Sequence, residues 1–302
     1  MIKYYRTMDH QIHEISEPME GTWISLVHPT AAELATIAAE YKIDIDDLRA
    51  PLDEEERSHI EVEEGYTLFI VDVPTTEERK EKEYFLTIPC GIILTEKVII
   101  TVCLEDTSVL ADFKNGRVRN FWTFKRTRFI LQILYRNASL YLQYLRIIDK
   151  KSDSVEKQLL IELLELEKSL VYFSTSLRSN ELVLEKMLKI DKIKQYPEDE
   201  ELLDDVIIEN KQAIEMADIY SNILSGTMDA YASVISNNLN IVMKVLAIIT
   251  IVMSIPTMIA SFWGMNVPVP LAHSPYGFLI LVIVSLILTI FGGYILGKKN
   301  MF

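Results

Sequence analysis

The stretch that decides the fold reads SNNLNIVMKVLAIITIVMSIPTMIASFWGMN and runs from Ser236 to Asn266. From Val245 to Gly297 the chain contains no Asp, Glu, Lys or Arg. Two apolar runs lie in or beside this window, at residues 240–262 and 278–297, and at ~1.5 Å per helical residue each is about 30 Å long. That length matches the hydrocarbon core of a bilayer. A buried soluble core rarely contains so long an uncharged segment, so the sequence predicts a membrane protein with two closely spaced spans.

One face of the first span is small or polar, whereas its other faces carry Ile, Val, Leu and Met. Steps of four and three residues along a helix stay on one face. Starting from Asp229, they reach Ser233, Ser236, Asn240, Met243, Ala247, Thr250, Ser254, Thr257 and Ser261. Close packing of helices through small residues would also use such a face, but it does not explain Asp229 and Asn240. Because unsatisfied polar groups are costly in hydrocarbon, we interpret the face as the wall of a water-lined path. One helix cannot enclose a pore, so this interpretation predicts a ring of copies.

The triplet Gly264-Met265-Asn266 directly follows the first span. Together with the upstream pattern SNNLNxxMKxL and the pair Pro256-Thr257, it resembles the CorA family of divalent-cation transporters, in which GMN closes the first of two C-terminal spans. The motif match covers residues 229–266, and the chain length fits the family architecture. The resemblance implies an α+β membrane protein with a cytoplasmic α/β domain, a long helical stalk and two C-terminal transmembrane helices. It also implies a homopentameric pore.

The resemblance further implies roles for individual residues. Gly264, Met265 and Asn266 would form the selectivity filter, where Gly264 and Asn266 bind the metal ion through its water shell. Met243 and Leu246 match the family's hydrophobic gate, which can close by dewetting, and Asp229 matches an acidic ring at the cytoplasmic end. The predicted pore-lining residues are Asp229, Ser236, Asn240, Met243, Leu246, Ala247, Thr250, Ser254 and Thr257.

Three features depart from the family pattern. The outer segment, residues 267–276 (VPVPLAHSPY), has no acidic residue, so it has no carboxylate that would attract cations to the mouth. Trp263 stands where Tyr commonly precedes GMN. Ser254 stands where a second apolar gate is expected, and Met253 lies one step off that face.

The sequence divides into three predicted parts. Residues 1–120 form an α/β domain, 121–239 a helical stalk region, and 240–302 a membrane domain with an outer loop at 263–277. Strand-like patterns occupy residues 22–27, 66–73, 84–94 and 97–103, and Thr30 with Glu33 predicts a capping box for a helix that continues to Lys42. We expect Cys90 and Cys103 on buried strands, and residues 53–57 (DEEER) on a solvated helix face.

A single long helix is predicted from Glu198 to Phe262, because no Pro or Gly pair interrupts the pattern before Pro256. Its length would be about 65 residues, or roughly 97 Å. Basic residues flank the membrane segment at Lys244, Lys298 and Lys299, whereas the outer loop has none. This distribution predicts a multi-pass protein of the bacterial cytoplasmic membrane with both termini in the cytoplasm. Gly293 and Gly297 are expected to let the second span pack closely on its neighbour.

Charge is unevenly distributed along the chain. The formal net charge is −14, and because Lys298 and Lys299 are the only charges after Val245, the preceding part carries −16. So acidic a region is not expected to bind nucleic acid. Residues 113–148 contain eight Lys or Arg and no acid, whereas 198–205 contain six acids and no base. These blocks are either solvated surface or helices that face each other within or between subunits.

No feature of the sequence indicates catalysis. His10, His13, His28 and His59 lack metal-ligand spacing, and no glycine-rich phosphate loop follows a strand, so we expect neither an enzyme nor a cofactor. The expected function is channel-like transport of hydrated Mg²⁺, with Co²⁺ or Ni²⁺ as further substrates. The membrane potential would drive the ions into the cytoplasm, and intracellular Mg²⁺ would gate the pore. The alternatives are a zinc-type transporter of the same superfamily and a non-transporting, membrane-anchored helical scaffold.

Overall fold

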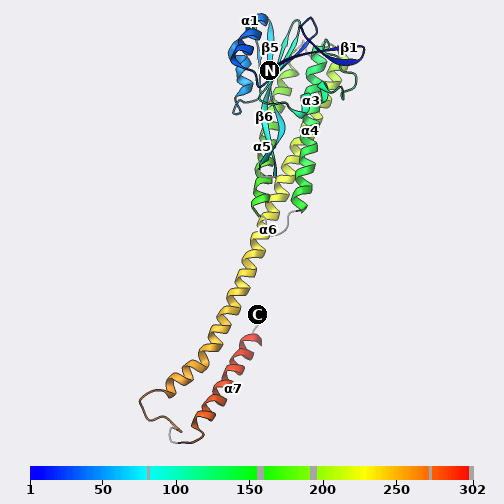
Figure 1. Cartoon of the computed structure of the whole chain (residues 1–302). Coiled ribbons are helices and arrows are strands. Elements are labelled where there is room, and N and C mark those ends of the chain that lie inside the picture. The colour runs from blue at the N-terminus through cyan, green and yellow to red at the C-terminus, as the bar shows by residue number, and fades with distance from the viewer. Residues whose placement is uncertain (80–81, 155–159, 191–195, 272–273, 299–302) are drawn as a thin grey trace. The chain divides into compact units, whose positions relative to one another are not determined.

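The computed structural model describes residues 1–79, 82–154, 160–190, 196–271 and 274–298. The chain divides into two compact units, Met1–Gly226 and Thr227–Phe302. Helix α6, Pro197–Trp263, contributes its first part to one unit and its second part to the other (Figure 1).

The first unit is built on a seven-stranded sheet with the order β2-β1-β3-β7-β6-β5-β4. Neighbouring strands are antiparallel except β3 and β7, which are parallel. The strands are β1 Ile2–Met8, β2 Gln11–Ile15, β3 Trp23–Val27, β4 His59–Val62, β5 Tyr66–Arg79, β6 Lys82–Thr95 and β7 Ile99–Cys103. The helices of this unit are α1 Ala31–Tyr41, α2 Ile45–Arg49, the 3₁₀ turn Ala50–Leu52, α3 Ser108–Lys114, α4 Arg126–Ser154, α5 Leu160–Met187 and the first part of α6.

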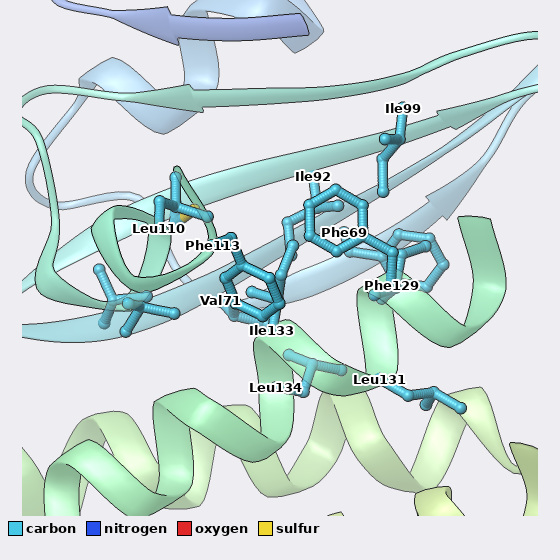
Figure 2. Close-up of a cluster of buried hydrophobic side chains, with 14 of the residues drawn as sticks. Phe69, Val71, Ile92, Ile99, Leu110, Phe113, Phe129, Leu131, Ile133 and Leu134 are labelled. Carbon is cyan, nitrogen blue, oxygen red and sulfur yellow. The ribbon is translucent and has the colours of Figure 1, made fainter. Parts of the chain in front are cut away.

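Helices cover both faces of this sheet because its central strands carry apolar side chains on both sides. On β5, Leu68 and Ile70 pack with residues of α1 and α2, whereas Phe69 and Val71 point to the opposite face. Figure 2 shows this opposite cluster, in which side chains of β5, β6 and β7 meet those of α3 and α4. The sheet is therefore the middle layer of an α/β unit with a core on each face.

Several predicted elements are confirmed. Helix α1 starts at the predicted capping box, since Thr30 Oγ1 accepts from Glu33 N at 3.3 Å and Glu33 Oε2 accepts from Thr30 N at 2.8 Å. It ends at Lys42 in the left-handed conformation. Cys90 and Cys103 are buried free thiols, directly opposite each other on β6 and β7, and Cys103 Sγ donates to Cys90 Sγ at 3.2 Å.

Other predictions missed the observed structure. β1, β2 and β4 were not predicted, and residues 53–57 are not helical. They follow the 3₁₀ turn in a short connection where Asp53 Oδ1 accepts from Glu55 N at 3.0 Å.

The basic and acidic blocks do face each other within one chain. Arg128, in the first turn of α4, lies 3.3 Å from Asp199 Oδ1 and 3.6 Å from Glu198 Oε2, both in the first turn of α6. About three helical turns further on, Ser139 donates to Glu209 at 3.2 Å. Of the two alternatives left open by the sequence, contact within the subunit is therefore the one observed at Arg128.

The second unit contains the rest of α6 and helix α7, Gly277–Lys298. Both helices are long and apolar enough to cross a membrane. Their apolar stretches are almost entirely unburied in the single chain, unlike those of a soluble core. Residues 272–273 of the predicted outer loop, and Lys299 from the orientation argument, lie outside the described residues.

Candidate ion path along helix α6

The predicted pore-lining residues all lie on α6, which places Asp229 and Thr257 on one continuous helix. Toward its C-terminal end, the structure brings part of the polar stripe into an open groove. The groove is lined by Ile249, Thr250, Met253, Ser254, Thr257, Met258 and Ser261. The groove does not include Asp229, Ser236 and Asn240, which are exposed further back along the helix.

Three of the four hydroxyl groups of this groove, those of Thr250, Ser254 and Thr257, are bonded to their own helix. Thr250 Oγ1 donates to the Leu246 carbonyl at 2.8 Å, Ser254 Oγ to that of Ile251 at 2.7 Å, and Thr257 Oγ1 to that of Met253 at 3.3 Å. A hydroxyl has one proton and two lone pairs. Since each proton is used within the helix, these side chains can offer only acceptor lone pairs to whatever occupies the groove.

Helix α7 packs on the opposite side of α6. A Cβ at Gly292 would lie 2.9 Å from Ile255 Cδ1, and one at Gly293 would lie 3.9 Å from Val252 Cγ2. Ile248 and Ser285 are also buried. At ~100° per helical residue, Ile248 and Ile255 are roughly opposite Thr250 and Thr257. The second helix therefore leaves the polar stripe uncovered.

The predicted gate residues are on the uncovered side of α6. Met243 and Leu246 are each 56% exposed, and Ala247 beside them is also exposed. Large apolar side chains so exposed in a single chain need a partner or a lipid environment. Leu246 lies about one turn and Met243 about two turns before Thr250, which places an apolar segment next to the acceptor-lined segment.

The GMN triplet follows the end of α6 immediately. Gly264 N donates to the Ala260 carbonyl at 3.0 Å, and Met265 and Asn266 are exposed. A Cβ at Gly264 would lie 3.4 Å from the Ala260 carbonyl oxygen, an ordinary contact. Among the described residues, no contact therefore requires glycine at this position.

Sequence reasoning missed the role of Gly292. The prediction named Gly293, which does face α6, but Gly292 makes the closer approach. The adjacent glycines in an otherwise apolar helix were the available signal. Among the described residues, no group of three or more His, Cys, Asp or Glu side chains could hold a metal ion. Within the groove itself, the polar side chains are the neutral hydroxyls of Thr250, Ser254, Thr257 and Ser261.

Comparisons with known proteins agree with this arrangement. Residues 19–298 match the family model described as CorA-like Mg²⁺ transporter protein. The chain is 28% identical to the cobalt/magnesium transport protein CorA of Methanocaldococcus jannaschii, with 94% of this chain and 93% of the relative covered.

Solved structures show the same fold. The complete structure of the CorA magnesium transporter from M. jannaschii superposes with a TM-score of 0.85 at 22% identity, covering 100% of this chain and 99% of that one. The cytoplasmic domain of ZntB from Vibrio parahaemolyticus is more distant, with a TM-score of 0.59 at 10% identity over 78% of this chain and 96% of that domain. The family match extends over nearly the whole sequence, including both apolar helices, and the chain belongs to the CorA family of Mg²⁺ transporter proteins.

Proposed function

We propose that this chain forms a channel-like transporter that passes hydrated Mg²⁺, and also Co²⁺ or Ni²⁺, into the cytoplasm. The observation that carries the proposal is the set of bonded hydroxyls on the uncovered face of α6. Family membership supports divalent-cation transport, and the relative from M. jannaschii is named for cobalt and magnesium.

The chemistry of the ion favours such a wall. Mg²⁺ dehydrates reluctantly and usually keeps several waters. The waters around a cation point their protons outward, so the wall of a path for a hydrated cation must accept hydrogen bonds. Thr250, Ser254 and Thr257 can accept and cannot donate to the path, because their protons are used by the helix. Neutral acceptors also avoid the tight binding that a ring of carboxylates would produce.

The filter and the gate occupy the two ends of this acceptor segment. Backbone carbonyls of Gly264 and amide oxygens of Asn266 would bind the water shell of the ion at the mouth. Met243 and Leu246 would close the path by excluding water, and Asn240 and Asp229 would form polar and acidic rings beyond the gate. These assignments follow from the family resemblance and from the order of the residues along α6.

A homopentamer is the assembly that we propose. A ring formed by the uncovered face of α6 would put α7 on the outside, in contact with lipid, because α7 packs on the opposite face. The side chains of α7 support this placement, since Phe278, Leu286 and Ile290 are exposed and apolar. With the termini in the cytoplasm, the inside-negative potential favours entry of a divalent ion by roughly 4.6 kcal/mol per 100 mV.

The test is ion uptake by the purified full chain in proteoliposomes with an imposed inside-negative potential. Mg²⁺ uptake should be competed by Co²⁺ and Ni²⁺ more effectively than by Zn²⁺. Preferred Zn²⁺ uptake would favour a zinc-type transporter, and absence of any uptake would favour a scaffold.

The filter is tested with Asn266→Ala. A hydrogen bond from the water shell to an amide contributes about 0.5–1.5 kcal/mol. Because every subunit of the ring loses one such bond, the variant should reduce uptake by at least about tenfold. The matched control is Asn222→Ala, an exposed asparagine of α6 in the first unit. Wild-type uptake by a correctly assembled Asn266→Ala protein would show that the filter lies elsewhere.

A further inference from the structure

Ser254 lies in the middle of the groove, between Thr250 and Thr257. Steps of four and three residues separate the three hydroxyls, which corresponds to about 6 Å and about 4.5 Å along the helix. Successive hydroxyls are thus close enough for one hydrated ion to bind the next ring before leaving the last.

We propose that Ser254 keeps the path hydrated from Thr250 to Thr257, so that Met243 and Leu246 form the single apolar barrier to ions. This inference rests on the proposed path and adds the position and number of its gates. In this proposal Ser254 determines ion conduction because its oxygen lone pairs bind water, and not because its side chain is small.

The direction of the Ser254 hydroxyl determines what this side chain can offer to the groove. Its proton is donated to the Ile251 carbonyl at 2.7 Å, within its own helix. The lone pairs of the oxygen are therefore free to accept a hydrogen bond from water in the groove, at a level where an apolar side chain would repel water. A pore closes by dewetting only where the wall is apolar around its circumference, and serine at this level prevents that.

The alternative to this inference is a second apolar gate formed by the two methionines beside Ser254. Met253 and Met258 line the edges of the same groove and are 65% and 54% exposed. Met253 is one residue from Ser254, or ~100° around the helix, on the flank of the stripe. In a ring of copies this flank faces the neighbouring helix, whereas Met243 lies on the stripe itself.

The first experiment compares Ser254→Thr with Ser254→Val in the proteoliposome assay. The two side chains have nearly the same shape, and only threonine has the hydroxyl. Threonine should retain most of the Mg²⁺ flux, whereas valine should reduce it by about tenfold. The matched control is Thr289→Val on α7, where Thr289 Oγ1 makes the same kind of bond to the Ser285 carbonyl at 2.7 Å but lies off the path. Equal flux through the two Ser254 variants would overturn the inference.

The second experiment restores a gate. Met243→Asp should remove the apolar barrier and leave the pore leaky when internal Mg²⁺ is high. Adding Ser254→Met to this variant should build a new apolar ring and suppress the leak. A leak that persists in the double variant, or one that also appears in Met253→Ala alone, would overturn the single-gate inference. If the wild-type protein shows no uptake, the proposed function itself fails, which separates that failure from failure of the inference.

Discussion

At the scale of single residues, the backbone carbonyl of Asp72 joins the sheet to two helices. It accepts hydrogen bonds from Asn180 Nδ2 at 2.8 Å, Asn137 Nδ2 at 2.9 Å and Tyr141 OH at 3.2 Å. Asn180 also accepts from Asp72 N at 2.9 Å. These polar contacts hold strand β5 against α4 and α5 within a core that is otherwise apolar. Buried hydrogen bonds of this kind specify one arrangement of the elements more sharply than apolar contacts do.

The carboxyl group of Asp72 is poorly accommodated in this arrangement. Burial raises its pKa above the ordinary value of 3.8, and hydrogen bonds from Ser176 and Ser58 lower it by less. Among the described residues Asp72 has no basic partner within ion-pair distance. Nearby, Asn137 Oδ1 is buried with no hydrogen-bond partner in the described part of the chain.

These facts predict how Asp72→Asn changes stability with pH. Above pH 3.8, Asp72 loses its proton in the unfolded state but retains it in the folded state. Deprotonation therefore stabilises the unfolded state, and the free energy of unfolding falls as pH rises through the raised folded pKa. The neutral asparagine does not titrate, so the variant should gain thermal stability relative to wild type as pH increases from about 4 to about 7. The measurement is thermal unfolding of the purified protein across this range, with the exposed Asp205→Asn as control. A stability difference that does not change with pH would contradict the assignment.

At the scale of helices and strands, the sequence predicted elements whose stability is local. The capping box of Thr30 and Glu33 specifies the start of α1 through contacts between residues only three positions apart. The long run without breakers specifies α6, although Pro256 lies within it. Pattern and capping are properties of neighbouring residues, so a single sequence contains them.

The missed strands β2 and β4 depend on hydrogen bonds to a partner strand. β2, with the sequence QIHEI, is mostly exposed and polar, and it is ordered by pairing with β1. β4, with the sequence HIEV, likewise depends on β5. Edge strands of this kind show little periodicity of their own, and strand preference depends on context. The acidic segment at residues 53–57 has the composition of a helix surface, but it forms an Asx turn at Asp53 instead of a helix.

The candidate path was predictable only in part for the same reason. Periodicity placed Thr250, Ser254 and Thr257 on one face of a helix. Which face α7 would cover depends on the contact of Gly292 with Ile255, which involves two separate helices. The direction of each hydroxyl depends on the local carbonyl, and only the structure gives it.

The contact between α6 and α7 predicts the effect of Gly292→Leu. A Cβ at this position would lie 2.9 Å from Ile255 Cδ1, so the end of the Ile255 side chain must move, and the three further carbons of a leucine need additional space between α6 and α7. Overpacking of this type costs about 1–3 kcal/mol. The variant should unfold at a lower temperature in detergent than wild type. Gly226→Leu is the matched control, because a Cβ at this helical glycine meets nothing within 4 Å. Equal destabilisation by both variants would indicate a general effect of losing glycine, not a specific contact.

At the scale of the whole molecule, the charge distribution bears on regulation. The part of the chain before Val245 carries −16, and the block of acids at the start of α6 is only partly compensated by Arg128. In a ring of copies, acidic surfaces of neighbouring subunits would approach one another. Like charges a few ångströms apart raise the free energy of that arrangement unless cations lie between them. We therefore propose that intracellular Mg²⁺ stabilises a closed ring, with acidic surfaces of residues 1–240 as the sensor.

This proposal predicts that Mg²⁺ protects the protein more than its ionic strength explains. A ligand shifts a conformational equilibrium only if it binds one state better. A divalent ion bound between carboxylates of two subunits meets that condition, whereas diffuse screening by monovalent ions does not. Because binding to the folded ring stabilises it by mass action, millimolar Mg²⁺ should slow limited proteolysis of the full chain and raise its unfolding temperature.

The control is a monovalent salt of equal ionic strength. Asn266→Ala, which changes the proposed filter and not the acidic surfaces, should show the same protection as wild type. Protection by the monovalent salt equal to that by Mg²⁺ would reduce the effect to screening and exclude the sensor, and loss of protection in Asn266→Ala would place the stabilising ion in the pore.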